Sequence, residues 1–362
     1  CLQVLLRRVP GGLALSVTIM GTIMAATTGI IGASVVMMTL LALPVMLDRN
    51  YDPSLATGTI AASGTLGILI PPSIMLVIMA DLLSISVGTL FLAAVIPGFL
   101  LAFIYTVYIY LRTKFNPKLA PPLPDGLGPK TKSELWIMIF KSFIPPIFLI
   151  MCVLGSIFAG IATPTEAAAV GALGSIILAL FNKRLTKAVI KSVTERSALT
   201  CAMIFGIFIG ATAFSYVFRS LGGDDLIHHF VDSMGLGSWG ILFFMMGMVF
   251  LLGFFFDWVE ITLIVLPLFA PILATLDFGN HLDPTMVIPW VAVLIAVNLQ
   301  TSFLTPPFGF ALFYLKGVAP PSIKIQMIYK GIIPFVILQL IGLILIIVFP
   351  ELVLWLPTKL LD

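Results

Sequence analysis

The stretch Ser63-Gly64-Thr65-Leu66-Gly67-Ile68-Leu69-Ile70-Pro71-Pro72-Ser73 lies inside an apolar segment that runs from residue 55 to residue 79. Roughly 20 apolar residues are enough to cross a bilayer, so the segment is long enough to span one. Its middle is nevertheless unfavourable for a helix. Two glycines lower helix propensity, and two consecutive prolines remove backbone donors and clash with the preceding turn. The sequence therefore predicts a membrane helix that is interrupted near its centre.

A second stretch of the same kind is Asn298-Leu299-Gln300-Thr301-Ser302-Phe303-Leu304-Thr305-Pro306-Pro307-Phe308-Gly309, inside the apolar segment 286–315. A carbonyl that a helix break releases in hydrocarbon costs several kcal/mol unless a partner satisfies it. Matched breaks in two halves of a chain therefore indicate ion or substrate sites of a secondary transporter. The competing interpretation is a pair of proline-kinked helices without a ligand.

The composition defines the class of protein. Of the 362 residues, 60% are hydrophobic and 10% are charged, whereas a soluble domain carries about 25% charged residues. The apolar runs are long and do not alternate, which predicts an all-α polytopic membrane protein rather than a barrel. The three cysteines and three histidines form no metal motif, and no phosphate loop or nucleophile elbow is present. We expect no transition metal and no nucleic-acid partner.

Two regions of the chain share one order of elements. In residues 1–111 we expect a re-entrant hairpin over 13–47, then a polar turn in which Asp52 is the N-cap and Pro53 the first helical residue, then the broken helix 54–79. In residues 241–315 we expect a hairpin over 241–276, then Asp283-Pro284, then the broken helix 286–315. Small and hydroxyl residues mark the first hairpin tip, and residues 256–262 interrupt the second. The similarity predicts two structural repeats of the kind found in transporters.

The remaining segments have simpler interpretations. Residues 112–134 are rich in proline and lysine, which predicts a cytoplasmic linker. Residues 135–240 are expected to form scaffold and arm helices, with a basic amphipathic segment at 182–196 followed by a span at 199–218. Residues 224–232 are polar, and residues 316–362 are expected to supply a C-terminal helix.

The distribution of basic residues tests this arrangement. When each hairpin returns to its own side, only Arg219 and Lys359 of the 19 basic residues fall outside the cytoplasm. This split follows the positive-inside rule, and reading either hairpin as a simple helix scrambles it. The same count puts the mouth of the first hairpin in the cytoplasm and that of the second outside. The two repeats are thus predicted to be inverted.

Three acids lie in or beside apolar segments, namely Glu166, Asp257 and Glu260. An ionisable group in a bilayer is a functional-site hypothesis by default. Asp257 and Glu260 would share a helix face and could bind a cation, gate the hairpin or cap a half-helix. Glu166 follows Thr163-Pro164-Thr165, for which a helix-start role is favoured over ligand binding.

The hydroxyls, glycines and released carbonyls of the broken spans suit a hard monovalent cation, which binds oxygen ligands. Hairpin tips also present free N–H groups, which favour an anionic substrate. Together these parts predict a sodium-coupled transporter for a small organic anion. Proton coupling through Asp257 and Glu260 is an alternative, as is a passive channel, although no continuous polar stripe for a channel is visible.

Several motifs resemble those of the large membrane (M-type) subunit of tripartite ATP-independent periplasmic (TRAP) transporters. The matching stretches are Gly64 to Ser73; Val95-Ile96-Pro97-Gly98; Gly160-Ile161-Ala162-Thr163-Pro164-Thr165-Glu166-Ala167-Ala168; Asp257 followed by Pro267 and Pro271; and Leu304-Thr305-Pro306-Pro307-Phe308-Gly309. The resemblance implies an ion-transporter-like fold and an elevator mechanism in the cytoplasmic (inner) membrane of a bacterium or archaeon. It also implies a small membrane (Q-type) subunit and a periplasmic substrate-binding protein as partners. Family members usually have further apolar sequence before the first hairpin.

The resemblance also implies site residues. The first sodium site would involve Gly29, Ser34, Ser63, Gly64, Gly67 and Ile70, and the second Asp257, Thr262, Thr301, Thr305 and Gly309. Substrate-binding residues would be Thr28, Ser73, Thr301 and Ser302. The bulky tip Phe254-Phe255-Phe256-Asp257-Trp258 resembles only a subset of the family, so a dicarboxylate substrate does not follow.

The function predicted from these observations is sodium-coupled import of a small organic acid by a non-enzymatic membrane subunit. One alternative is a binding-protein-independent sodium symporter of the dicarboxylate or citrate type, which differs in whether uptake needs an added soluble protein. A more distant alternative is an intramembrane enzyme, but the sequence has no catalytic dyad matched to Asp257 and Glu260. A third is a scaffold that does not transport.

Overall fold

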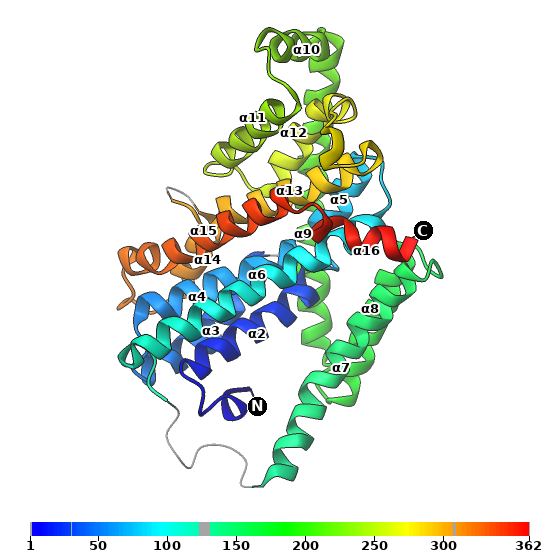
Figure 1. Cartoon of the computed structure of the whole chain (residues 1–362). Helices are drawn as coiled ribbons and strands as arrows, with labels where there is room; N and C mark the ends of the chain where they lie inside the picture. The colour runs from blue at the N-terminus through cyan, green and yellow to red at the C-terminus, as the bar shows by residue number, and fades with distance from the viewer. Residues whose placement is uncertain (1, 30, 123–130, 307–308, 362) are drawn as a thin grey trace.

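The computed structural model describes residues 2–29, 31–122, 131–306 and 309–361, and every regular element within these ranges is helical. Figure 1 shows how the helices are arranged. The α-helices are α1 (Leu2–Leu5), α2 (Gly12–Thr28), α3 (Ile31–Asp48), α4 (Pro53–Thr65), α5 (Ile74–Leu82), α6 (Val87–Phe115), α7 (Lys132–Phe158), α8 (Pro164–Phe181), α9 (Lys187–Ser220), α10 (Gly223–Ser233), α11 (Ser238–Leu252), α12 (Trp258–Leu273), α13 (Val287–Leu304), α14 (Phe310–Val318), α15 (Ile325–Val348) and α16 (Glu351–Leu361). Short 3₁₀ turns are η1 (Leu66–Ile68), η2 (Pro117–Leu119), η3 (Gly279–His281) and η4 (Pro284–Met286).

The first of the two similar regions consists of α2, α3, α4, η1 and α5. Helices α2 and α3 occupy the range where the sequence predicts the first hairpin, and the chain turns between them at Gly29, whose φ is +61°. Helix α4 tightens into η1 and stops, and α5 restarts at Ile74 with Ser73 as its N-cap. The chain is therefore not one straight helix through Pro71.

The second region consists of α11, α12, α13 and α14. Helices α11 and α12 pair over the range of the second predicted hairpin, and α13 ends at Leu304 before α14 begins at Phe310. One expectation changes here: the turn of this hairpin spans residues 253–257, because Asp257 is the N-cap of α12. Residues 258–262 are already helical and lie in the first turns of α12 rather than in the tip.

Helix caps account for the polar residues at several helix starts. The Asp52 carboxylate accepts a hydrogen bond from the Leu55 amide at 2.8 Å, with Pro53 at the first helical position, as the sequence predicts. The Asp283 carboxylate accepts from the amide and hydroxyl of Thr285, which hold the pKa of Asp283 below its usual range. Glu166 and Thr163 form a capping box. The helix-start role favoured for Glu166 is thus confirmed.

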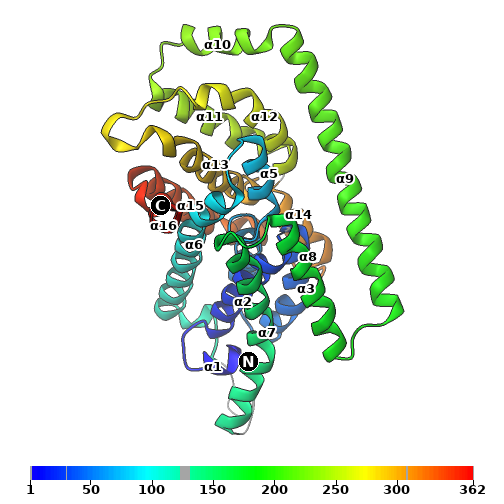
Figure 2. The ribbon, with the colours of Figure 1, turned by 90° about the vertical axis from the view of Figure 1, so that its right-hand side faces the viewer.

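Helices α7 and α8 project from the rest of the molecule (Figure 1), and α9 runs along one side of it (Figure 2). Helix α9 is a single helix of 34 residues that begins at Lys187. Most of the basic segment at 182–196 and the whole span at 199–218 therefore belong to one helix. The polar stretch at 224–232 lies in helix α10, and the C-terminal region holds two helices, α15 and α16, rather than one.

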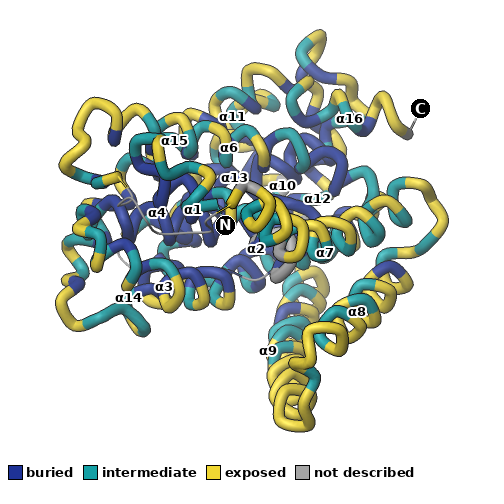
Figure 3. The backbone as a smooth tube through the Cα atoms, turned by 90° about the horizontal axis from the view of Figure 1, so that it is seen from below, coloured by how far each residue is buried: buried dark blue, intermediate teal, exposed yellow. Residues whose placement is uncertain are grey.

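Burial separates two kinds of helix (Figure 3). Seven helices in the described part are long and apolar enough to cross a membrane. In α13 most side chains are inside the protein, and 94% of its most apolar window is buried. By contrast, the corresponding windows of α7, α8 and α9 are 0%, 6% and 6% buried. Since these exposed faces are apolar, they suit lipid or partner contact, whereas α4 and α13 form the packed centre.

Candidate functional site

The first hairpin packs closely on α4 just before the break. A Cβ atom placed on Gly64 would lie 2.5 Å from Cγ2 of Val35, and one on Gly21 would lie 2.5 Å from Cβ of Ser63. Glycines at these two positions allow α3 and α2 to approach α4. Ser34, the neighbour of Val35, is fully buried. The structure thus brings Ser34, Ser63 and Gly64 into one contact region.

The tip of the first hairpin lies on the other side of the break. A Cβ atom on Gly29 would be 3.6 Å from the Pro72 carbonyl oxygen and 3.5 Å from Cγ1 of Ile74. The Ser73 hydroxyl donates to the Ile68 carbonyl at 2.6 Å, which satisfies one of the acceptors left at the end of η1. This tip therefore faces the start of α5.

Two further predicted residues act through the main chain. Gly67 lies inside η1 and is buried. Ile70 directs its side chain to α6, since a Cβ on Gly98 would be 2.8 Å from Cγ1 of Ile70. Neither residue can offer a side-chain oxygen, so their contribution to a cation site would come from carbonyl groups. The side chain of Thr28 lies outside the described part of the structure.

The second hairpin packs on α13 in a similar manner. A Cβ atom on Gly253 would lie 2.1 Å from Cβ of Ser302. The Ser302 hydroxyl donates to the Asn298 carbonyl at 3.2 Å, and the Asn298 amide donates to the Met246 carbonyl at 2.7 Å. Ser302 therefore lies in the contact between α11 and α13.

The start of α12 carries the acidic residues. Asp257 caps the helix, its carboxylate accepting a hydrogen bond from the Trp258 amide at 2.8 Å. Oε2 of Glu260 and Oγ1 of Thr262 are buried and have no hydrogen-bond partner. An unpartnered buried oxygen costs free energy that a bound cation would offset. Capping and cation binding are compatible at Asp257, because a carboxylate offers several lone pairs.

The end of α13 presents a column of hydroxyls. Thr301 donates to the Val297 carbonyl at 3.1 Å, and Thr305 donates to the Thr301 carbonyl at 2.8 Å. Each hydroxyl uses its hydrogen in this bond and keeps lone pairs for another partner. Gly309 follows with φ +46°, a left-handed conformation that favours glycine, and it leads into α14.

A small cavity lies where these elements meet. It has a volume of about 70 Å³, and its lining includes the N-terminal residues of four helices: Ile31 of α3, Ile74 of α5, Trp258 of α12 and Phe310 of α14. Helix N-termini carry unpaired N–H groups and the positive end of the helix dipole. Four of them around one cavity make a favourable environment for an anionic group.

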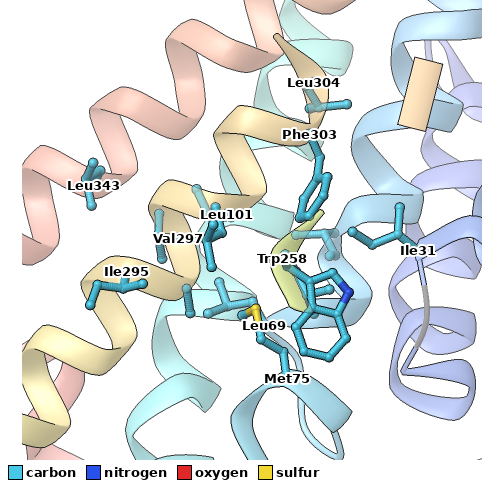
Figure 4. Packing of buried hydrophobic residues seen from close by; sticks show 14 of the residues in the cluster. Ile31, Leu69, Met75, Leu101, Trp258, Ile295, Val297, Phe303, Leu304 and Leu343 are labelled. Atoms are coloured by element: carbon cyan, nitrogen blue, oxygen red, sulfur yellow. The ribbon is translucent and has the colours of Figure 1, made fainter. Parts of the chain in front are cut away.

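Apolar side chains surround this cavity and one long helix borders it. Figure 4 shows Trp258 grouped with Leu69, Met75 and Phe303 in the buried cluster. Asp257, Phe303 and Tyr314 contribute to the lining. From α9 come Thr200, Met203 and Ile204. A carboxylate and an aromatic hydroxyl residue therefore share the cavity with the helix N-termini.

Sequence reasoning located the breaks and hairpins but missed several lining residues. Tyr314 lies five residues after Gly309, and a helical count from the second break could have suggested it. Thr200 belongs to a distant helix and carries no signal in the sequence. Of the predicted substrate-binding residues, Ser73, Thr301 and Ser302 do not appear in the described lining.

The fold and site define a multi-pass helical membrane protein with two interrupted helices at its centre, which is the architecture of a transporter component. Comparison with known proteins makes the class specific. The sequence model described as "Tripartite ATP-independent periplasmic transporter, DctM component" matches residues 1–352. The chain belongs to this family, which confirms the prediction of a TRAP large membrane subunit.

Curated relatives have names of the same kind. The C4-dicarboxylate TRAP transporter large permease protein DctM of Pseudomonas aeruginosa is 31% identical over 350 residues, which cover 96% of this chain and 78% of the relative. The ectoine/5-hydroxyectoine TRAP transporter large permease protein UehC of Ruegeria pomeroyi is 28% identical, and the match covers 96% of this chain and 77% of the relative. The sialic acid TRAP transporter permease protein SiaT of Haemophilus influenzae is 29% identical, and the match covers 87% of this chain and 48% of the relative. These relatives are permeases and not enzymes, so the enzyme alternative is set aside.

Proposed function

We propose that this protein imports a small organic acid together with Na⁺, as the transmembrane subunit of a binding-protein-dependent TRAP system. The observation that carries the proposal is the cavity at which both breaks and both hairpin tips meet. Its four helix N-termini suit the carboxylate of an organic acid. A volume of about 70 Å³ admits a small polar group, since one water needs about 10–15 Å³.

We assign the ligands of a co-transported sodium ion to oxygen atoms at the two breaks, where Asp257 also lines the cavity. At the second break these are the hydroxyls of Thr262, Thr301 and Thr305 and the carboxylate of Asp257. At the first break they are the hydroxyls of Ser34 and Ser63 and the main-chain carbonyls around Gly64, Gly67 and Ile70. Hard cations take oxygen ligands of these kinds. Each set is supplied by one hairpin and its partner broken helix, so one ion would couple to each pair.

One contact supports the relation of the two regions as inverted repeats. Thr65 and Gln300 each lie six residues before the first proline of their Pro-Pro pair. The Gln300 amide donates to the Thr65 hydroxyl at 3.4 Å. A residue that contacts its own counterpart lies close to the axis that relates two repeats. An elevator movement of these repeats against α7 and α8 would give alternating access.

The partners follow from family membership. A small membrane subunit and a periplasmic substrate-binding protein would complete the system in the inner membrane. The relatives named above differ in substrate while sharing this subunit type. The proposal therefore assigns the acid-binding cavity to this chain without naming the acid.

Thermal unfolding of the purified full-length protein in Na⁺, Li⁺ and K⁺ tests the sodium assignment. A ligand at 100 times its Kd stabilises the native state by about 2.7 kcal/mol. We expect Na⁺ to raise the unfolding temperature at constant ionic strength and K⁺ to leave it unchanged. Equal responses to the three cations would contradict sodium binding.

Uptake into proteoliposomes tests the partners. The subunit is reconstituted with its small membrane subunit and a sodium gradient, and labelled acid is supplied with or without the binding protein. We expect uptake only when the binding protein is added. Uptake without it would favour the binding-protein-independent symporter.

A further inference from the structure

Helix α12 of the second hairpin contains two prolines four residues apart, Pro267 and Pro271. In a regular α-helix the carbonyl of residue 267 would accept the N–H of residue 271. Proline has no N–H, so Pro271 removes this donor. The carbonyl of Pro267 must therefore find another partner or remain unpaired in a membrane protein.

The partner comes from a different part of the fold. Arg219, in the last turn of α9, directs Nη2 to the Pro267 carbonyl oxygen at 3.2 Å. The two residues are 48 positions apart in the sequence. Helices α9 and α12 also pack against each other near α10 (Figure 2). The guanidinium thus supplies from outside the helix the hydrogen bond that Pro271 cannot make.

We infer that Arg219 is a positioning residue that fastens the second hairpin to the end of α9. The fastening depends on the proline pair, because only the proline at 271 leaves the carbonyl of 267 open to an external donor. It fixes α12, whose first residues, Trp258 and Val259, line the cavity. Since α9 also lines that cavity through Thr200 and Met203, this hydrogen bond, together with the packing of α9 on α12, holds the two walls of the cavity in place.

A double-mutant cycle in the full-length protein tests the dependence of Arg219 on Pro271. The proteins compared are wild type, Arg219→Leu, Pro271→Ala and the double variant, with the unfolding temperature as the readout. We expect Arg219→Leu to lower the unfolding temperature in the wild-type background. In the Pro271→Ala background the alanine N–H satisfies the carbonyl, so the same change should lower it by less than half as much.

Lys191→Leu is the matched control. Lys191 lies near the other end of the same helix, and its ion pair with Glu195 is 3.7 Å long and highly exposed. Removing this charge should leave the unfolding temperature unchanged in both backgrounds. Equal losses from Arg219→Leu in both backgrounds, or no loss in either, would overturn the inference.

Cysteine labelling separates a local role from a general loss of stability. In a background with Cys1, Cys152 and Cys201 replaced by serine, a cysteine replaces buried Leu263 of α12 or buried Met38 of α3. We expect Arg219→Leu to speed maleimide labelling at position 263 severalfold and to leave position 38 unchanged. Faster labelling at both positions, or at neither, would show that Arg219 does not hold the second hairpin. These measurements require no transport, so their outcome is separate from that of the proposed function.

Discussion

The two helix breaks share a Pro-Pro pair, but the surrounding residues differ. At the first break, Gly21 and Gly64 allow the hairpin to approach closely, and residues 25–34 of that hairpin include no ionisable residue in the sequence. At the second break, Asp257 stands at the start of α12, and Thr301 and Thr305 line the end of α13. In the proposed function, the first region would supply mainly carbonyl groups held by tight packing, and the second would supply side-chain oxygens.

Under the proposed function, the same arrangement of hairpin and broken helix would form an oxygen-rich site in two ways. Where carbonyls are the ligands, specificity depends on steric fit, so glycines are essential and charge is not. Where side chains are the ligands, removing one oxygen changes binding without changing the packing. Substitutions at the two breaks should therefore fail in distinguishable ways.

The largest effect is expected from Gly64→Ala. The added Cβ would lie 2.5 Å from Cγ2 and 3.2 Å from Cα of Val35, which is fully buried and cannot move aside. Overpacking of this kind costs about 1–3 kcal/mol, and displacement of the hairpin should abolish sodium-dependent uptake. Unfolding temperature and uptake measure the two effects.

The control is Gly206→Ala on α9, where a Cβ would meet no atom within 4 Å. Alanine is favoured over glycine in a helix by about 1 kcal/mol, so this variant should be slightly more stable and fully active. Wild-type stability and uptake in Gly64→Ala would contradict the role of close packing at the first break.

Asp257→Asn is expected to have the next largest effect. Asparagine is as good an N-cap as aspartate, so the start of α12 should remain intact while the carboxylate is lost. We expect an unchanged unfolding temperature without sodium and an apparent sodium affinity about tenfold weaker, equivalent to about 1.4 kcal/mol. Sodium titration of thermal stability gives both values.

Asp257→Ala distinguishes the two roles. It removes the cap as well and should lower stability by about 1 kcal/mol even without sodium. If Asp257→Asn keeps the wild-type sodium affinity, Asp257 caps the helix and does not bind sodium.

Thr305→Val should have a smaller effect than Asp257→Asn, since it removes one neutral oxygen while keeping the shape of the side chain. In the wild type, the Thr305 hydroxyl donates to the Thr301 carbonyl at 2.8 Å and keeps its lone pairs for the ion. Valine has no such lone pairs. We expect a severalfold increase in the sodium concentration needed for half-maximal uptake. Thr305→Ser keeps the oxygen and should behave as wild type, and equal behaviour of Val and Ser would exclude a role for the hydroxyl.

The smallest effect is expected at the contact between the two regions. Gln300 donates to Thr65 at 3.4 Å, and Oε1 of Gln300 is buried without a partner. Replacing both partners with apolar residues of similar shape is close to neutral for a hydrogen bond. The double variant Thr65→Val/Gln300→Leu should therefore unfold near the wild-type temperature, while Thr65→Val alone leaves the amide unpaired and should be less stable. A double variant less stable than either single variant would show that this pair contributes more than its weak geometry indicates.

The helical membrane class, the two interruptions, the caps at Asp52 and Asp283 and the helix-start role of Glu166 follow from the amino-acid sequence. These depend on local chemistry, because proline removes a donor and an acidic or hydroxyl side chain caps the helix that follows it in the chain. The sequence placed the second hairpin tip too late in the chain, since residues 258–262 form the first turns of α12 instead of belonging to the tip.

Which helix ends meet depends on the packing of the whole fold. The cavity joins residues from α3, α5, α9, α12, α13 and α14, and the hydrogen bond between α9 and α12 joins Arg219 and Pro267, which are 48 residues apart. Such contacts arise from packing between segments that are distant in the chain, and no local pattern in a single sequence indicates which segments pack together. Helix length, helix caps and helix breaks depend on residues that are close together in the sequence, whereas the site depends on how the fold brings the two breaks together.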